Sequence, residues 1–240
     1  MKTAAAICLA LAAASCAAPP FDPPPVLDVP RLSGAGPAID GDLSDPCWQT
    51  AAATTNGPAV RILWSPGALH LAFDCDDADV LCSGALPHDG DLYREDAFEA
   101  FFDGAGDGRA FVEIQVAPDG TTLDLLHLYT AEPVAGENGV VLPSVAATDR
   151  WCLREWEMPG LRAAARRREG GWSAELSVPA DPAILRRTGA LVFGPGTEIR
   201  AQFVRCDHPG GAFVQTTWSP CVAGCPHSSP SRFGLLHLLP

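Results

Sequence analysis

Residues 172–178 alternate apolar and polar side chains, and this period of two constrains the fold more than any other feature. The segment reads Trp-Ser-Ala-Glu-Leu-Ser-Val, so every second side chain is apolar. A β-strand sends successive side chains to opposite faces, so the pattern predicts a strand with one face in a core.

Similar runs recur along the chain, separated by Gly and Pro. They predict strands over residues 59–64, 69–73, 97–102, 111–116, 122–128, 161–167, 200–205, 213–218 and 233–238. The pattern favours only one helix, a turn or two over Pro182–Arg187. Many short strands and few helix signals predict an all-β fold, an antiparallel β-sandwich of jelly-roll type. We expect a single domain with at most one short helix.

Four of the six tryptophans are predicted to lie in the core. Trp64, Trp172 and Trp218 sit on predicted strands among apolar neighbours. Trp48 follows an acidic turn, and we expect its side chain to close one end of the sandwich. Large aromatic side chains dominate the energetics of cores, so these four are expected to be structural rather than ligand-binding.

The N-terminus predicts export. Lys2 precedes an apolar run, rich in Ala and Leu, that is too short to span a bilayer permanently, so residues 1–15 read as a signal peptide. The run ends in Ala-Ala-Ser-Cys, which resembles a bacterial lipobox, so we expect cleavage before Cys16 and a lipid on its thiol. The alternative is an ordinary secretory signal cleaved near Ala18.

The segment that follows predicts a tether. Residues 16–29 are rich in proline, which restricts the backbone and favours a semi-rigid spacer. The folded domain is then expected over residues 30–240, a length that can bury a sizeable core. A lipid at Cys16 would hold this domain at the cell envelope, on the outer membrane or the periplasmic face.

The charge balance excludes one class of partner. The chain has 16 Lys plus Arg against 29 Asp plus Glu, a formal net charge of −13. A nucleic-acid-binding surface needs an excess of basic side chains, so nucleic acid is not an expected partner. The acidity is typical of an exported, soluble domain and attracts cations.

Four motifs, in this order and spacing, resemble the family 9 carbohydrate-binding modules and their relatives. They are Pro37–Trp48, Asp96–Asp103, Gly171–Pro179 and the C-terminal run Thr217–Leu238 with its Phe-Gly pair. The resemblance covers roughly residues 30 to 240. It implies a β-sandwich that binds carbohydrate without catalysis. It also implies a role in glycan capture or breakdown beside partner glycan-degrading enzymes.

The resemblance carries a set of binding positions onto this chain. Relatives clamp a terminal sugar between two tryptophans, whose positions match Tyr93 and His227 here, and their acidic strand residue matches Glu99. An arginine of the family matches Gln115, which departs from the pattern. The expected carbohydrate-binding residues are therefore Tyr93, Glu99, Gln115, Gln202, Arg205 and His227.

Catalysis is not expected. Asp96 and Glu99 lie three apart on a predicted strand, so their side chains should point to opposite faces and not form an acid–base pair. The sequence also lacks a Gly-x-Ser-x-Gly elbow. Two alternatives remain: a scaffold sandwich with a degenerate pocket, and a haem-binding module of similar topology that would use Met158 and a histidine.

Nine cysteines in an exported chain predict disulfides. Cys75 with Cys82, and Cys221 with Cys225, are close enough in sequence to pair locally. A zinc set is the alternative that the residues leave open. It would use Cys206, Cys221, Cys225, His208 and His227.

The resemblance also implies a structural calcium ion, since family members often carry one. Asp76 and Asp77, in an acidic run after a predicted strand, are the candidate ligands because calcium prefers several oxygen donors. A solvated acidic loop is the alternative. The sequence indicates no other cofactor.

Overall fold

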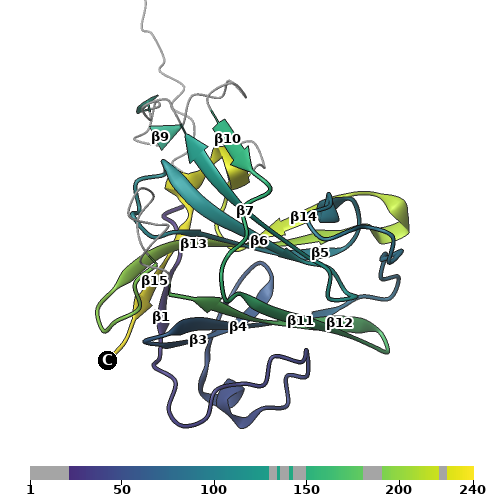
Figure 1. Cartoon of the computed structure of the whole chain (residues 1–240), viewed down its shortest axis with the longest axis horizontal. Helices are drawn as coiled ribbons and strands as arrows, with labels where there is room; N and C mark the ends of the chain where they lie inside the picture. The colour runs from purple at the N-terminus through teal and green to yellow at the C-terminus, as the bar shows by residue number, and fades with distance from the viewer. Residues whose placement is uncertain (1–21, 130–133, 136–140, 143–149, 181–190, 222–225) are drawn as a thin grey trace, which may run out of the picture.

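Two β-sheets packed face to face form the molecule (Figure 1). The computed structural model describes residues 22–129, 134–135, 141–142, 150–180, 191–221 and 226–240. In spatial order the larger sheet contains β1 (Val26–Val29), β15 (Gly234–Leu238), β13 (Glu198–Asp207), β5 (Ala97–Asp103), β6 (Ala110–Val116), β7 (Thr122–Tyr129) and β10 (Arg150–Leu153), with β14 (Val214–Thr217) also paired to β13.

The smaller sheet lies beneath the larger one in Figure 1. Its order is β11 (Arg162–Arg168), β12 (Gly171–Pro179), β4 (Ala68–Asp76), β3 (Ala59–Ser65) and β2 (Ala52–Ala53). A separate two-stranded pair joins β8 (Val134–Ala135) and β9 (Val141–Leu142). The strand pairs are antiparallel except β1 with β15, which run parallel.

The predicted β-sandwich is confirmed, and all ten predicted strands are present with small shifts at their ends. The described residues contain no α-helix, only 3-10 turns. These are η1 (Pro46–Thr50), η2 (Leu92–Arg94), η4 (Pro209–Gly211), η6 (Pro226–Ser228) and η7 (Pro230–Arg232). The predicted helix over Pro182–Arg187 lies outside the described residues.

The main core lies between the two sheets. Phe98 and Phe102 on β5 point toward the smaller sheet, and the Phe98 ring stacks on Phe73 of β4 with ring centroids 4.6 Å apart. Each is fully buried, which stabilises the fold by about 1.5–3 kcal/mol per side chain.

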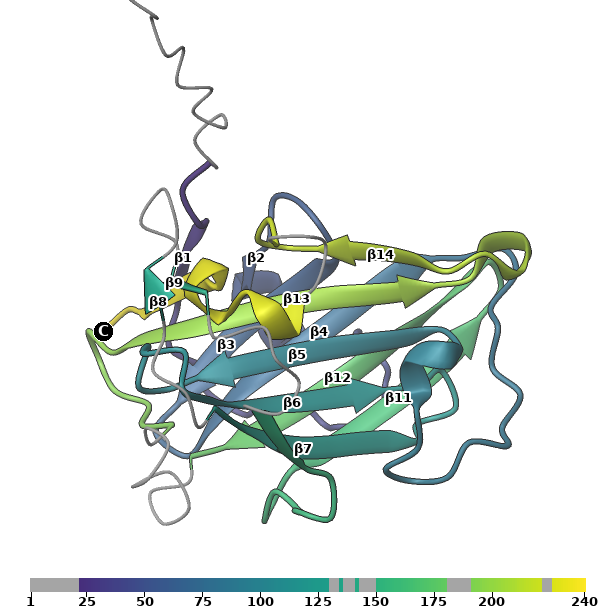
Figure 2. The same cartoon turned by 90° about the horizontal axis from the view of Figure 1, so that it is seen from above.

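The larger sheet is also covered on its outer face, the face turned away from the smaller sheet. All seven residues of β5 and all seven of β6 are buried, so both faces of these strands are enclosed. Phe101, Phe111 and Phe233 form a second apolar cluster there. Figure 2 looks onto this face, where the C-terminal turns in yellow cross the strands.

The predicted core tryptophans are all buried, each with no more than 3% of its surface exposed. Trp48 differs in place from the prediction. It packs with Leu63 and Ala72 on the outer face of the smaller sheet rather than closing an end of the sandwich. Its indole N–H donates to Glu175 on β12 at 2.8 Å.

The N-terminal boundary differs from the prediction. Residues 26–29, expected as the end of the tether, form β1 and pair with β15, where Val29 is fully buried. Leu235 N–H also donates to the carbonyl of Pro25 at 2.8 Å. The predicted signal peptide and Cys16 lie outside the described residues. Within the described residues, no helix is long and apolar enough to cross a membrane.

The predicted disulfide between Cys75 and Cys82 is not formed, and both are free thiols. Cys75 lies on β4 within the main core, and burial raises the pKa of its thiol to about 12. Cys82 lies instead on the loop after β4, where its carbonyl accepts from Arg167 at 2.9 Å. Cys225 lies outside the described residues, so its pairing with Cys221 stays a prediction.

Candidate functional site

A cavity of about 230 Å³ opens on the outer face of the larger sheet. We call it the outer-face cavity. Strands β5, β6 and β7 supply its floor, and residues from η2, β10, η6 and the segment around β14 form its walls. Its volume lies below the range of roughly 300–1,000 Å³ typical of drug-sized ligands, so it suits one small ring or the end of a chain.

Two buried carboxylates on the floor share one amide. Gln115 Nε2 donates to Glu99 Oε1 at 2.9 Å and to Glu113 Oε1 at 2.6 Å. The antiparallel register of β5 and β6 places Glu99 directly opposite Gln115, and Glu113 lies two residues along on the same face. All three side chains are at most 3% exposed. Buried polar groups need such partners, because unpaired ones are costly to desolvate.

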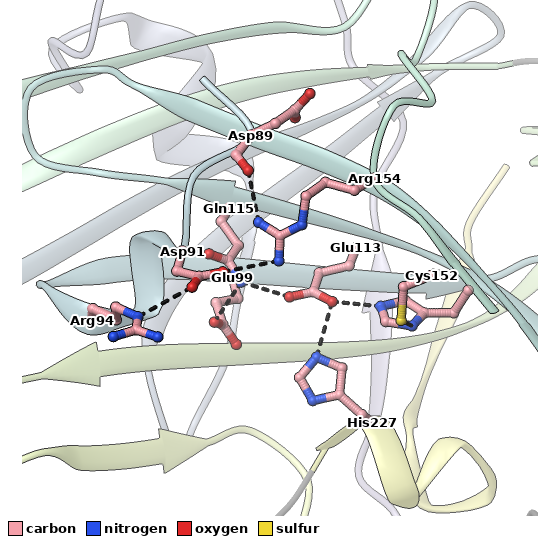
Figure 3. Close-up of polar contacts among 10 residues, drawn as sticks. Asp89, Asp91, Arg94, Glu99, Glu113, Gln115, Cys152, Arg154 and His227 are labelled. Atoms are coloured by element: carbon pink, nitrogen blue, oxygen red, sulfur yellow. Dashed lines mark hydrogen bonds and ion pairs between the residues drawn. The ribbon is translucent and has the colours of Figure 1, made fainter. Parts of the chain in front are cut away.

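Two imidazoles meet the other oxygen of Glu113 (Figure 3). Glu113 Oε2 lies 2.6 Å from Nε2 of His127 on β7 and 2.9 Å from Nε2 of His227 in η6. Burial alone would raise the pKa of the Glu113 carboxyl, but the charges of both histidines and their hydrogen bonds outweigh it. The pKa of Glu113 therefore lies well below its ordinary value, so the carboxylate is ionised at neutral pH.

The histidine ring positions are fixed by packing. His127 stacks on Phe111 with centroids 4.5 Å apart, and its Nδ1 lies 3.4 Å from Sγ of Cys152 on β10. The ring of His227 meets the face of Phe101 edge-on at 5.3 Å. The site is therefore held by the second apolar cluster beside it on the same face of the sheet.

The mouth of the outer-face cavity carries exposed rings and one arginine. Tyr93 is 42% exposed and Phe213 is 54% exposed. Arg154 donates to the carbonyl of Asp89 at 2.7 Å and to Oδ1 of Asp91 at 3.0 Å (Figure 3). These contacts hold the positively charged guanidinium of Arg154 at the edge of an otherwise acidic cavity.

Four of the six predicted binding residues line this cavity: Tyr93, Glu99, Gln115 and His227. Gln202 does not line it. Although Gln202 shares the outer face, its amide is fully buried, with Nε2 donating to the carbonyl of Ser219 at 2.7 Å and Oε1 accepting from Ser219 N–H at 2.8 Å. Gln202 therefore holds the segment after β14 in place.

Arg205 also lies elsewhere. It pairs with Phe98 across β13 and β5, so it points to the other face of the sheet from the cavity. Its guanidinium forms ion pairs with Asp77 at 3.2 Å and Asp207 at 3.1 Å.

The two expected calcium ligands, Asp76 and Asp77, do not lie together at one site. The Asp76 side chain is 95% exposed and pairs with Arg168 at 2.9 Å, whereas Asp77 pairs with Arg205.

The regrouped acids do not fit a calcium ion well. Asp77, Asp96 and Asp207 offer oxygens within 4.8 Å of one another. The guanidinium of Arg205 already contacts two of these three carboxylates, Asp77 and Asp207, and compensates one of their two negative charges. The positive charge of Arg205 would repel a calcium ion bound by these acids, so we assign no calcium to this cluster.

The alternative zinc set is also divided. Nδ1 of His208 lies 3.3 Å from Asp96 Oδ1, whereas His227 lies at the outer-face cavity. Cys206 is buried beside Glu99, with Sγ 3.4 Å from Oε1. Cys225 is outside the described residues.

Asp96 and Glu99 do not face each other. Asp96 contacts His208, whereas Glu99 accepts from Gln115 on the floor of the outer-face cavity, so the two carboxylates form no acid–base pair.

The sequence did not single out several residues of the cavity. They are Asp91, Glu113, His127, Cys152, Arg154, Phe213 and Gln215. Glu113 had a usable signal, because it shares the face of Gln115 on a predicted strand. His127 and Arg154 had none, since only the pairing of β7 with β6 and β10 brings them to Glu113 and Asp91.

No protein-family model matches the sequence, and no curated protein does. Solved structures do match the fold. A family 9 carbohydrate-binding module from Caldicellulosiruptor kristjanssonii, solved with cellotriose, aligns with a TM-score of 0.59 and 15% identity over 89% of this chain and 93% of its own. A module of that family and organism solved with glucose gives 0.57 and 17% over 88% and 95%.

A third structure supports the same fold. A candidate carbohydrate-binding protein from Bacteroides uniformis aligns with a TM-score of 0.63 and 15% identity, over 90% of this chain and 99% of its own. Coverage of nearly the whole of each chain shows that the likeness extends to the complete sandwich. The chain therefore has the fold of the family 9 carbohydrate-binding modules.

Proposed function

We propose that the chain is a non-catalytic carbohydrate-binding protein that holds one sugar unit in the outer-face cavity. One observation carries this: buried polar groups converge on the floor of a small cavity whose mouth carries two exposed aromatic rings. Sugars present both hydroxyls and apolar C–H faces, so a sugar site needs both kinds of wall. The solved modules of this fold hold cellotriose and glucose, which supports the ligand class.

The rings supply the apolar half of the recognition. Tyr93 and Phe213 expose aromatic surface to water at the mouth of the cavity, a placement that costs free energy unless a ligand covers it. A pyranose can lay its C–H face against such a ring. Tyr93 is positioned by the η2 turn, and the Arg94 guanidinium lies 5.9 Å from its ring centroid.

The floor supplies the polar half. Gln115 Oε1 has no hydrogen-bond partner among the described residues and is shielded from solvent, so it can accept from a ligand hydroxyl once the side chain turns toward the cavity. Glu99 and Glu113 add charged acceptors, and Arg154 adds a donor at the rim. Bonds to charged groups are the stronger ones, at roughly 1.5–3 kcal/mol each.

The arrangement of the carboxylates favours binding over hydrolysis. The Gln115 amide donates to Glu99 and Glu113 at once, so it occupies the space in which a glycosidic bond would have to lie. Export, a lipid anchor at Cys16 and work beside glycan-degrading enzymes complete the proposal. They rest on the N-terminal sequence and on the resemblance.

A haem pair made of Met158 with His127 or His227 fits the geometry poorly. Met158 packs in the main core between the sheets and is 5% exposed. His127 and His227 lie on the outer face of the larger sheet. An axial Met–His pair made from these residues would need to cross the sheet. The scaffold alternative predicts instead a cavity without affinity for any glycan.

A glycan array followed by calorimetry tests the proposal. The domain, residues 22–240, is screened, and the best glycan is then titrated into wild type, Phe213→Ala and Glu99→Gln. We expect Phe213→Ala to weaken binding about tenfold and Glu99→Gln about tenfold to a hundredfold.

Val192→Ala is the matched control for the loss of exposed apolar surface. Val192 is 54% exposed, like Phe213, and does not line the cavity. Its affinity should equal that of wild type, and melting curves should show all variants folded. Binding that is unchanged in both cavity variants, or an array without a hit, would contradict the proposal.

A further inference from the structure

We propose that Glu113, His127 and His227 form a binding site for a divalent transition-metal ion, best matched by zinc, on the floor of the outer-face cavity. The three offer one oxygen and two imidazole nitrogens, all within 4.8 Å of one another. This inference goes beyond sugar binding and does not depend on it.

The donor atoms already converge on one point. Glu113 Oε2 lies 2.6 Å and 2.9 Å from the Nε2 atoms of His127 and His227. Zinc binds nitrogen and oxygen at about 2.0–2.2 Å, so ligand atoms around a tetrahedral ion stand about 3.3 Å apart. The Glu113–His127 distance must therefore lengthen by about 0.7 Å and the Glu113–His227 distance by about 0.4 Å. His227 can provide the second of these movements, because it sits on a 3-10 turn and its side chain is 26% exposed. The first falls on Glu113 and His127, whose side chains are each 2% exposed.

Neighbouring side chains orient the three proposed ligands, as is usual in metal sites. Gln115 Nε2 holds the Oε1 atom of Glu113, which leaves Oε2 directed at the two imidazoles (Figure 3). The Nδ1 atom of His127 faces Sγ of Cys152, so its Nε2 is the nitrogen turned to Glu113. Such outer partners fix the ring orientation and the tautomer of a metal-bound histidine.

The charge of the cavity favours a cation. Asp91, Glu99 and Glu113 line it as acids, and Arg154 is its one basic side chain besides the histidines among the described lining residues. A divalent ion would compensate this excess of negative charge, which is partly buried. Mixed imidazole and carboxylate ligands suit zinc and its neighbours, whereas calcium prefers oxygen alone. All three residues line the outer-face cavity, so we expect a fourth ligand to enter from it.

Metal titration of the chelator-treated domain tests the inference. Zinc chloride is titrated into wild type, His227→Asn and Glu113→Gln by calorimetry. We expect one ion per chain in wild type, and at least a hundredfold weaker binding in each variant, because each loses one of three ligands. Cobalt(II) in place of zinc should give the visible absorption of a tetrahedral site in wild type only.

The control is His237→Asn. His237 is also paired with a carboxylate, with Nδ1 2.9 Å from Asp28 Oδ1, but among the described residues it belongs to no such three-residue group. Its zinc affinity should match that of wild type. If Glu113→Gln fails to fold, the zinc affinity of His227→Asn alone tests the site, because His227 is partly exposed and its replacement should leave the fold intact.

Two outcomes would overturn the inference: zinc binding as tight in His227→Asn as in wild type, or no binding by wild type at micromolar zinc. Glycan titrations with and without zinc then separate the proposals. Loss of zinc binding in His227→Asn supports the metal site whether or not sugar binding changes, because His227 also lines the cavity. Sugar binding without zinc binding in wild type would overturn the metal site and leave the sugar site intact.

Discussion

Trp48 donates its indole N–H to the buried carboxylate of Glu175, across 127 residues of sequence, at 2.8 Å. The same carboxylate accepts the backbone N–H groups of Asp40 and Gly41 at 3.0 and 2.9 Å. One side chain of β12 therefore anchors the whole segment from Pro37 to Trp48. Gly41 is required there, since its φ is +83° and a Cβ would lie 2.7 Å from the Ala165 carbonyl carbon.

Trp48→Phe should destabilise the domain by about 1–3 kcal/mol, because it leaves a buried acceptor of Glu175 without its donor. Urea unfolding measures this as a lower midpoint with unchanged slope. Trp172→Phe is the matched control, since the Trp172 indole N–H has no hydrogen-bond partner among the described residues. A larger loss for Trp172→Phe than for Trp48→Phe would contradict the anchoring role of Glu175.

Gly234→Ala should destabilise the domain by several kcal/mol, at the upper end of single substitutions. A Cβ at Gly234 would lie 2.4 Å from Cζ3 of the buried Trp218 ring, so the strand or the ring must move. Thermal unfolding provides the measurement. Gly67→Ala is the control, because nothing lies within 4 Å of its Cβ position. Equal melting temperatures for the two variants would show that the Trp218 contact is not tight.

Stability should fall as the pH rises from about 4 to about 6. Burial raises the pKa of Asp103 from 3.8 to about 6, despite hydrogen bonds from the N–H groups of Gly108 and Gly106. A folded-state pKa above the unfolded one favours the folded state at low pH, and this advantage is lost as the pH passes the folded pKa. The linked change is on the order of 3 kcal/mol.

Asp103→Asn isolates this effect, because an amide does not titrate. The free energy of unfolding is measured at pH 4 and pH 7 for both proteins. The difference between the two pH values should be smaller in Asp103→Asn by most of that amount. An identical pH dependence in both proteins would mean that Asp103 does not titrate in this window.

Cys16→Ser should release the full-length protein from the membrane fraction or leave it unprocessed, since the predicted lipid is attached through the Cys16 thiol. Fractionation of expressing cells and mass spectrometry of the mature protein are the measurements. Cys47→Ser is the control, because Cys47 lies inside the folded domain as a free thiol. Unchanged mass and membrane association in Cys16→Ser would refute lipidation.

The sequence predicts the sandwich well because its signals are local. Alternation and Gly–Pro breaks mark most of the long strands, so the predicted ranges match β3 to β7 and β11 to β15 closely, whereas the two-residue strands β2, β8 and β9 carry no such signal. β1 and β10 were missed because proline or polar residues hide the alternation in Val26–Val29 and Arg150–Leu153. Their pairing with β15 and β7 is a tertiary effect.

The site was predicted only in part because it is assembled across strands. Glu99 and Gln115 follow from strand parity, whereas Arg205 lies three residues after Gln202 and so points to the opposite face, which parity alone could have excluded. His127 and His227 reach Glu113 from 14 and 114 residues away. No local sequence pattern predicts these contacts between Glu113 and the two histidines.

Nuclear magnetic resonance of the Gln115 side-chain amide tests the central claim most directly. This NH₂ group donates to both floor carboxylates, so a sugar in the outer-face cavity must change its surroundings. On titration with the glycan selected by the array, we expect the Gln115 NH₂ signal and the backbone signals of Tyr93 and Phe213 to shift together to one saturating affinity. Saturable binding that leaves these three signals in place, with shifts confined to the smaller sheet, would contradict the account.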